Sequence, residues 1–90
     1  EGEVQVYTSG GEEMKEENLL KKIAIDPKVM LGKPVIKGTR LAVELILEKL
    51  AYGATYEDIL KDYPFLSKDD IRAAVLYASK VISTEEVFAA

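Results

Sequence analysis

The chain is organised around ten consecutive residues, Gly32-Lys33-Pro34-Val35-Ile36-Lys37-Gly38-Thr39-Arg40-Leu41. Two glycines and a proline restrict its backbone, and the pair Val35-Ile36 is predicted to form a short extended segment. Because Pro34 has no N–H to donate, we expect this segment to lie at a sheet edge or in an irregular arm. Gly38 is expected to adopt a positive φ in the turn that follows. We therefore interpret the stretch as a structured arm that leads into a helical region.

The first predicted helix starts at Leu41, where apolar residues begin to repeat with the 3.6-residue period of an α-helix. It is expected to end near Tyr52, because Gly53 is a suitable residue for a helix C-terminus. Its predicted apolar face consists of Val43, Ile46, Leu47 and Leu50.

The next two predicted helices each begin at a capping-box pattern, with Asp in place of the usual Glu or Gln. Thr55-x-x-Asp58 predicts a helix over residues 56–62, which Pro64 ends. Ser67-x-x-Asp70 predicts a third helix of about 15 residues. The inward side chains are expected to be Tyr56, Ile59, Leu60 and Tyr63 in the second helix, and Ile71, Ala74, Val75, Ala78 and Ile82 in the third.

Three short helices with tight connections predict a mainly α fold, a three-helix homeodomain-like (helix-turn-helix) bundle with short N-terminal β-strands or an arm. We divide the chain into an acidic N-terminal tail, residues 1–22, and a trihelical DNA-binding-like domain, residues 23–90. Residues 4–8 alternate as in a strand, and so short a strand needs a partner. Its Val4, Val6 and Tyr7 are candidate dimer or partner contacts. Residues 12–22 suit either a solvated helix or a linker, residues 23–25 a second strand, and residues 28–31 one helical turn.

The composition excludes several classes of chemistry. The chain has no Cys and no His, so thiol nucleophiles, His general bases and His or Cys metal sites are all excluded. No nucleophile–base pair is visible, and we expect no enzyme activity, no cofactor and no metal. No apolar run approaches the roughly 20 residues that span a bilayer, and the N-terminal residues show no apolar h-region of a signal peptide. We therefore expect a cytoplasmic protein that does not enter membranes.

The net charge of −4 conceals an uneven distribution. Residues 1–20 contain six Glu and one Lys and carry −5, whereas residues 21–42 contain five Lys, one Arg and one Asp and carry +5. A basic segment of this kind can bind phosphates even when the whole chain is acidic. It can equally neutralise the acidic tail within the molecule, and the two interpretations stay open.

Five cations are candidate DNA contacts: Lys33, Lys37, Arg40, Lys68 and Arg72. The first three lie on the arm, where phosphate contacts are expected. Lys68 and Arg72 are outward positions at the start of the third helix, which would be the reading helix of a helix-turn-helix unit. Asp69 and Asp70 argue against DNA contact by this face, although Asp70 is also the expected cap partner of Ser67. For Arg40 we favour a structural role, either as the i,i+4 ion-pair partner of Glu44 or as a cap on the C-terminus of a neighbouring helix.

Several of these features together resemble the domain of unknown function 433 family. They are Asp26-Pro27, the run from Gly32 to Arg40, Gly53, Tyr63-Pro64, Ile71-Arg72-Ala73-Ala74 and Tyr77-Ala78. The resemblance covers about residues 23–80 and implies a homeodomain-like trihelical fold. It also implies a role as a VapB-like antitoxin that partners a PIN-domain ribonuclease toxin. It supplies no catalytic residues.

Two functions are compatible with these observations. In the first, the protein is an antitoxin-type regulator that binds operator DNA as a homodimer and neutralises a PIN-domain toxin. In the second, it is a protein-interaction module that binds a partner protein without binding DNA, and its acidic tail docks on a basic site. The identity of the toxin and the operator sequence do not follow from the residues.

Overall fold

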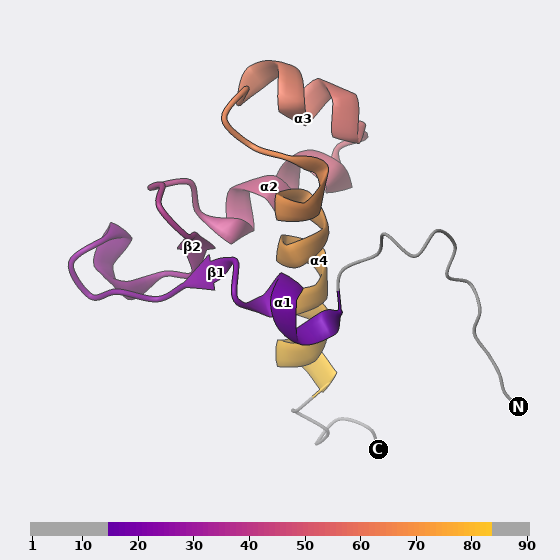
Figure 1. Cartoon of the computed structure of the whole chain (residues 1–90). Coiled ribbons are helices and arrows are strands. Elements are labelled where there is room, and N and C mark those ends of the chain that lie inside the picture. Colours follow the sequence, from indigo (N-terminus) through magenta and orange to yellow (C-terminus); the bar gives the residue numbers. More distant parts are fainter. Residues whose placement is uncertain (1–14, 84–90) are drawn as a thin grey trace, which may run out of the picture.

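The computed structural model describes residues 15–83. This part of the chain is mainly helical, with four α-helices and one small two-stranded sheet (Figure 1). No helix within it is long and apolar enough to cross a membrane. The elements in chain order are α1 (Glu16–Leu20), β1 (Ile23–Ala24), the 3-10 turn η2 (Met30–Gly32), β2 (Val35–Ile36), α2 (Val43–Ala51), α3 (Tyr56–Asp62) and α4 (Lys68–Ser83).

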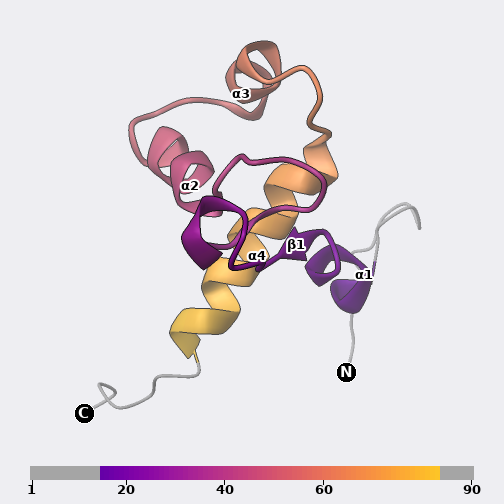
Figure 2. The same cartoon turned by 90° about the vertical axis from the view of Figure 1, so that its left-hand side faces the viewer.

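The long helix α4 is the axis of the fold, and α1, α2, α3 and β1 all pack against it (Figures 1 and 2). The three largest fully buried side chains are Ile46 of α2, Ile59 of α3 and Ile71 of α4. Each of the three predicted helices therefore contributes one side chain to the centre of the core. Truncating any of them to Ala removes buried methylenes and leaves a cavity, which typically costs about 2–5 kcal/mol.

The segment Val35–Ile36 has backbone hydrogen bonds on both sides, which corrects the expectation of an edge or irregular arm. On one side it pairs antiparallel with β1, with Ile23 opposite Ile36. On the other side the Ile36 N–H donates to the Leu41 carbonyl at 3.0 Å. Pro34 does not interrupt this arrangement because it precedes the strand and uses only its carbonyl, which accepts from the Val43 N–H at 2.9 Å.

The turn after β2 has the predicted geometry. Gly38 has φ +83°, and a Cβ placed there would meet no atom within 4 Å, so only the backbone conformation favours glycine. The Thr39 hydroxyl donates to the Ile36 carbonyl at 2.8 Å and accepts from the Leu41 N–H at 2.9 Å. This side chain closes the turn and directs the chain into α2.

The predicted helices are confirmed, with one shifted boundary. α2 begins at Val43 and not at Leu41, because Leu41 and Ala42 still bond to the extended segment. α3 has the predicted bounds. Both capping boxes are present: Thr55 exchanges hydrogen bonds with Asp58, and Ser67 does so with Asp70.

The buried face of α4 differs from the predicted stripe. Val75 and Ile82 are 40% and 67% exposed, whereas Ala73, which was not predicted, is fully buried. The pattern along α4 does not report that α1 also packs against this helix and adds to its buried surface. For residues 12–22 the alternatives were a solvated helix or a linker. Residues Glu16–Leu20 form a helix, and its Leu19 is buried. The predicted strand with Val4, Val6 and Tyr7 lies outside the described residues.

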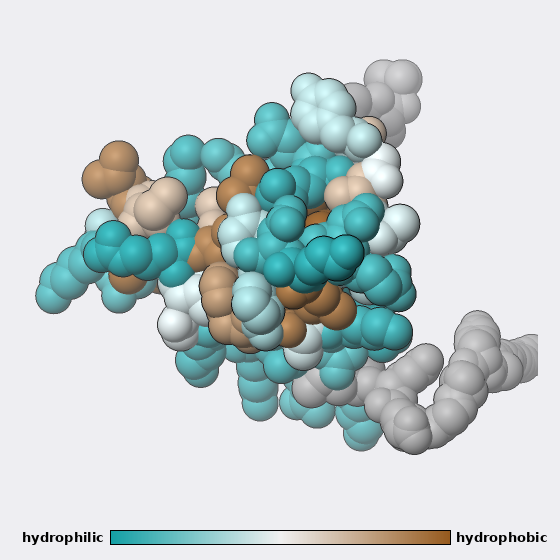
Figure 3. Space-filling view, turned by 90° about the horizontal axis from the view of Figure 1, so that it is seen from above, coloured by the Kyte–Doolittle hydropathy of each residue, from teal (hydrophilic) through white to brown (hydrophobic). Residues whose placement is uncertain are grey.

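The connection between β1 and β2 extends from the body as a loop (Figure 1). Met30 and Leu31 have positive φ angles of 49° and 57°, which non-glycine residues rarely adopt, and Gly32 continues the run at 84°. Leu31 is 92% exposed, and Ile25 and Met30 are also exposed. Hydrophobic atoms therefore reach the surface at the left of the space-filling view, where this loop lies (Figure 3). We refer to Ile25, Met30 and Leu31 as the apolar loop tip.

Candidate nucleic-acid interface

Four residues recur every three or four positions along α4 and face away from the core: Lys68, Arg72, Val75 and Ser79, all of them exposed. We call this set the outer face of α4. Its last three members line one shallow hollow together with Leu19, Tyr56 and Leu76. The outer face therefore offers two cations near the start of the helix, followed by an apolar side chain and a hydroxyl.

Both carboxylates that argued against DNA contact by this face have cationic partners. Asp69 lies 3.2 Å from the Arg72 guanidinium, in an exposed i,i+3 ion pair. Asp70 accepts from the Ser67 N–H at 2.9 Å and lies 3.5 Å from the Lys22 ammonium. An exposed ion pair contributes only about 0–1 kcal/mol, so a phosphate can replace Asp69 as the partner of Arg72 at little cost.

Lys33, one of the predicted DNA contacts, has a carboxylate partner. Its ammonium lies 3.1 Å from the Glu44 carboxylate at the start of α2, and both side chains are exposed. The bond between the Pro34 carbonyl and the Val43 N–H brings these two segments together. Within residues 15–83, Glu44 thus pairs with Lys33 and not with Arg40, so this one of the two structural alternatives for Arg40 is not formed. Arg40 itself is exposed in the turn after β2.

Lys37 has two cationic neighbours, Lys21 and Lys22, that are not among the five predicted DNA contacts. Its backbone N–H donates to the Lys22 carbonyl at 2.7 Å, across the β1–β2 pair. The two side chains share a hollow with Lys21, Asn18 and Asp70. The +5 charge of residues 21–42 indicated a basic segment, but only the strand register shows which of its lysines come together.

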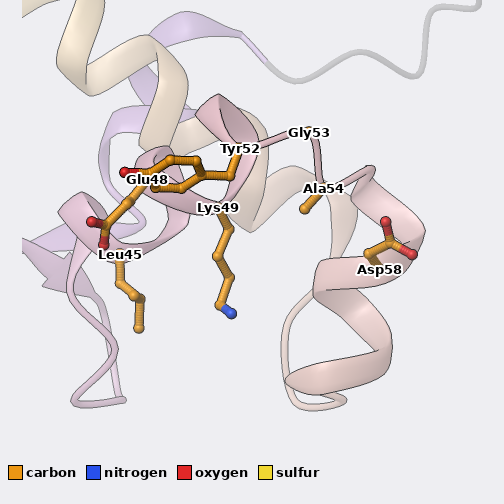
Figure 4. Close-up of a pocket in the computed structure, with 7 residues that line it drawn as sticks. All are labelled: Leu45, Glu48, Lys49, Tyr52, Gly53, Ala54 and Asp58. Atoms are coloured by element: carbon orange, nitrogen blue, oxygen red, sulfur yellow. The ribbon is translucent and has the colours of Figure 1, made fainter.

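One hollow holds two carboxylates that belong to different helices. It lies between the end of α2 and the start of α3, and Figure 4 shows that its carboxylates, Glu48 and Asp58, extend from different helices and do not converge. Asp58 already serves as a cap: hydrogen bonds from the Thr55 backbone and hydroxyl lower the pKa of its carboxyl. No cluster of three or more metal-ligating side chains occurs among residues 15–83.

The fold is therefore a small helical domain with an exposed, cation-bearing helix. The chain belongs to the family described as Protein of unknown function (DUF433), which matches residues 23–78. The resemblance found in the sequence is thus confirmed at the level of the family. The match begins at β1, so α1 with its Asn18, and Lys21 and Lys22 after it, lie before the match.

Two proteins are similar to this chain, one in sequence and one in fold. The chain is 34% identical over 56 residues to the uncharacterized protein y4eO of Sinorhizobium fredii (strain NBRC 101917 / NGR234), a match that covers 62% of the chain and 25% of that protein. The chain thus spans about a quarter of the length of this curated relative. A DUF433 member protein from Anabaena variabilis ATCC 29413, solved by crystallography, has a similar fold, with a TM-score of 0.67 and 29% identity, covering 76% of this chain and 67% of that chain.

Proposed function

We propose that this domain is a DNA-binding regulator of the antitoxin type, with a homeodomain-like arrangement in which α4 is the reading helix. The observation that carries the proposal is the outer face of α4. Arg72 suits a guanine edge or a phosphate, Lys68 a phosphate, and Val75 the methyl group of thymine. The helix has 16 residues and is roughly 24 Å long, which is sufficient to lie in a major groove.

The charge distribution supports the same proposal. All twelve Lys and Arg residues lie within residues 15–83, together with ten carboxylates, so this part carries a net charge of +2. The six remaining carboxylates lie in residues 1–14 and 84–90. The acidity of the whole chain therefore does not describe the folded part, whose surface is compatible with a polyanion.

The test is duplex binding across a salt series, with DNA from upstream of the gene and an unrelated duplex. We expect sequence preference and a linear fall of log K with log salt concentration. Arg72→Ala is expected to weaken binding of the preferred duplex about 5- to 150-fold, the equivalent of 1–3 kcal/mol, and to reduce the sequence preference. Lys61→Ala on α3 removes an exposed cation elsewhere and serves as the control. Absence of both sequence preference and salt dependence would refute DNA binding.

The second part of the proposal concerns the partner protein. We propose that a homodimer of this chain neutralises a PIN-domain ribonuclease, as the family resemblance implies. The carboxylates of residues 1–14 support it, because a ribonuclease requires a cationic groove for RNA and an acidic segment can occupy such a groove. Deletion of residues 1–14 is expected to lower the affinity for the co-purified toxin, and unchanged affinity would contradict this role.

The apolar loop tip favours a second candidate, a protein-interaction module that does not bind DNA. Exposed leucine and methionine at the end of a loop are suited to a hydrophobic pocket on a partner protein. Under this alternative, a Met30→Ser, Leu31→Ser double variant loses the partner protein, while neither it nor the parent protein binds the duplex. Duplex binding by the parent protein would exclude the alternative.

A further inference from the structure

We propose that the hollow lined by Asn18, Lys21, Lys22, Lys37 and Asp70 binds a phosphate group of the nucleic-acid backbone. We refer to it as the lysine hollow. The proposal rests on the proposed function, because it assigns to the DNA a second contact outside the outer face of α4. It also involves three residues, Asn18, Lys21 and Lys22, that precede the family match.

Two segments that are separate in the sequence build the lysine hollow. Lys21 and Lys22 connect α1 to β1, and Lys37 follows β2 directly. The backbone bond from the Lys37 N–H to the Lys22 carbonyl fixes these two residues side by side. Asn18, from the last turn of α1, adds a side-chain amide that can donate to an anion. The hollow is about 360 Å³ and open to solvent, so a phosphate on an extended backbone can reach it.

The charges in the hollow are unbalanced. Three ammonium groups face one carboxylate, and that carboxylate is already engaged. Asp70 caps the start of α4 through the Ser67 N–H and lies 3.5 Å from the Lys22 ammonium, so it positions Lys22. Lys21 and Lys37 are exposed and form no ion pair with another residue of the described range 15–83. Their mutual repulsion favours an anion from outside the molecule.

The position of the hollow is compatible with a contact that flanks the outer face of α4. Asn18 lines the lysine hollow, and its neighbour Leu19 lines the hollow next to Arg72 and Val75. The two sites are therefore both lined by residues of α1 and of α4. Lysine phosphate contacts of this kind position a protein on a duplex and carry no sequence information. The lysine hollow is thus expected to contribute affinity, and the outer face of α4 sequence preference.

The experiment compares Lys21→Ala, Lys37→Ala with a matched double variant, Lys28→Ala, Lys61→Ala, which removes two exposed lysines outside the hollow. Inorganic phosphate is titrated into each full-length protein while the backbone amide NMR signals are followed. The parent protein and the control are expected to show saturable shifts at Asn18, Lys22 and Lys37, and the hollow variant to lose them. Urea unfolding midpoints verify that both variants are folded.

The same proteins are then titrated with the preferred duplex. Loss of one phosphate contact is expected to lower the magnitude of the slope of log K against log salt concentration by about 0.9. The loss of affinity in the hollow variant is then roughly eight-fold larger at 0.1 M salt than at 1 M salt. The preference between duplexes is expected to stay unchanged. A hollow variant that matches the control in slope would overturn the inference and leave the proposed function intact. A protein that shows the NMR shifts with inorganic phosphate but binds no duplex would have a phosphate site that does not serve DNA. That result would overturn both the inference and the proposed function.

Discussion

Replacing Leu31 by Gly is expected to stabilise the fold, although the change removes a large apolar side chain. Leu31 has φ 57° and ψ 31°, in the left-handed helical region, and lies between Met30 and Gly32, which also have positive φ. Its side chain is 92% exposed and therefore contributes almost nothing to the core. The dominant effect of the substitution is relief of the backbone conformation.

The magnitude follows from two opposing terms. A left-handed conformation costs an L-residue about 1–2 kcal/mol, and glycine avoids this cost. Glycine also increases the entropy of the unfolded chain, which opposes folding by about 0.4–1 kcal/mol. The middle values of the two ranges differ by about 0.8 kcal/mol, which is the net stabilisation expected. With a urea m-value of about 1 kcal/mol/M for a small domain, the unfolding midpoint is expected to rise by roughly 0.8 M.

The measurement is urea unfolding of the parent protein, Leu31→Gly and Leu31→Ala. The alanine variant is the control, because it removes the exposed side chain but keeps the Cβ that disfavours positive φ. It is expected to differ from the parent by less than about 0.5 kcal/mol. A midpoint for Leu31→Gly at or below that of the parent would refute the reasoning, as would an equal rise in the alanine variant.

Three further outcomes are expected. Gly38→Ala should lower the free energy of unfolding, measured in urea, by about 1–2 kcal/mol. The alanine must adopt φ +83°, which is unfavourable for a residue with a Cβ, and its methyl group gains no contact in return. Because the pKa of the Asp58 carboxyl is lowered in the fold, its ionised form stabilises the fold at pH values above the ordinary pKa of a carboxyl. This contribution is lost as the pH falls through the lowered pKa. Asp58→Asn should therefore flatten the pH dependence of the urea midpoint below about pH 4; an unchanged profile would contradict the capping role. Lys33→Ala should cost less than about 1 kcal/mol in thermal unfolding, since its ion pair with Glu44 is exposed.

The parts of the fold that the sequence predicted are those with local signals. The two capping boxes each involve residues three positions apart, and they placed the starts of α3 and α4. Gly38 is similar, because a single residue type reports the turn conformation. In each case the determining contacts lie within a few residues, so the pattern along the chain contains the necessary information.

The rest depended on contacts between distant segments. The buried face of α4 was misplaced at Val75 and Ile82 because no local pattern along this helix shows that α1 packs against it. The candidate site was affected in the same way. Lys22 and Lys37 are neighbours only through the register of β1 and β2. The charge of the segment was visible in the sequence, but its arrangement in space was not.

The ion pair between Glu16 and Lys80, at 2.7 Å, brings the first helix of the described fold against the last turn of its final helix. Entry and exit of the chain therefore lie on the same side, at the C-terminal end of α4, whereas α3 and the start of α4 are at the opposite end (Figure 1). A unit with adjacent ends can be inserted into a surface loop of a host protein without stretching that loop. Inserted in this way, the domain would present the start of α4 on the side that faces away from the host protein.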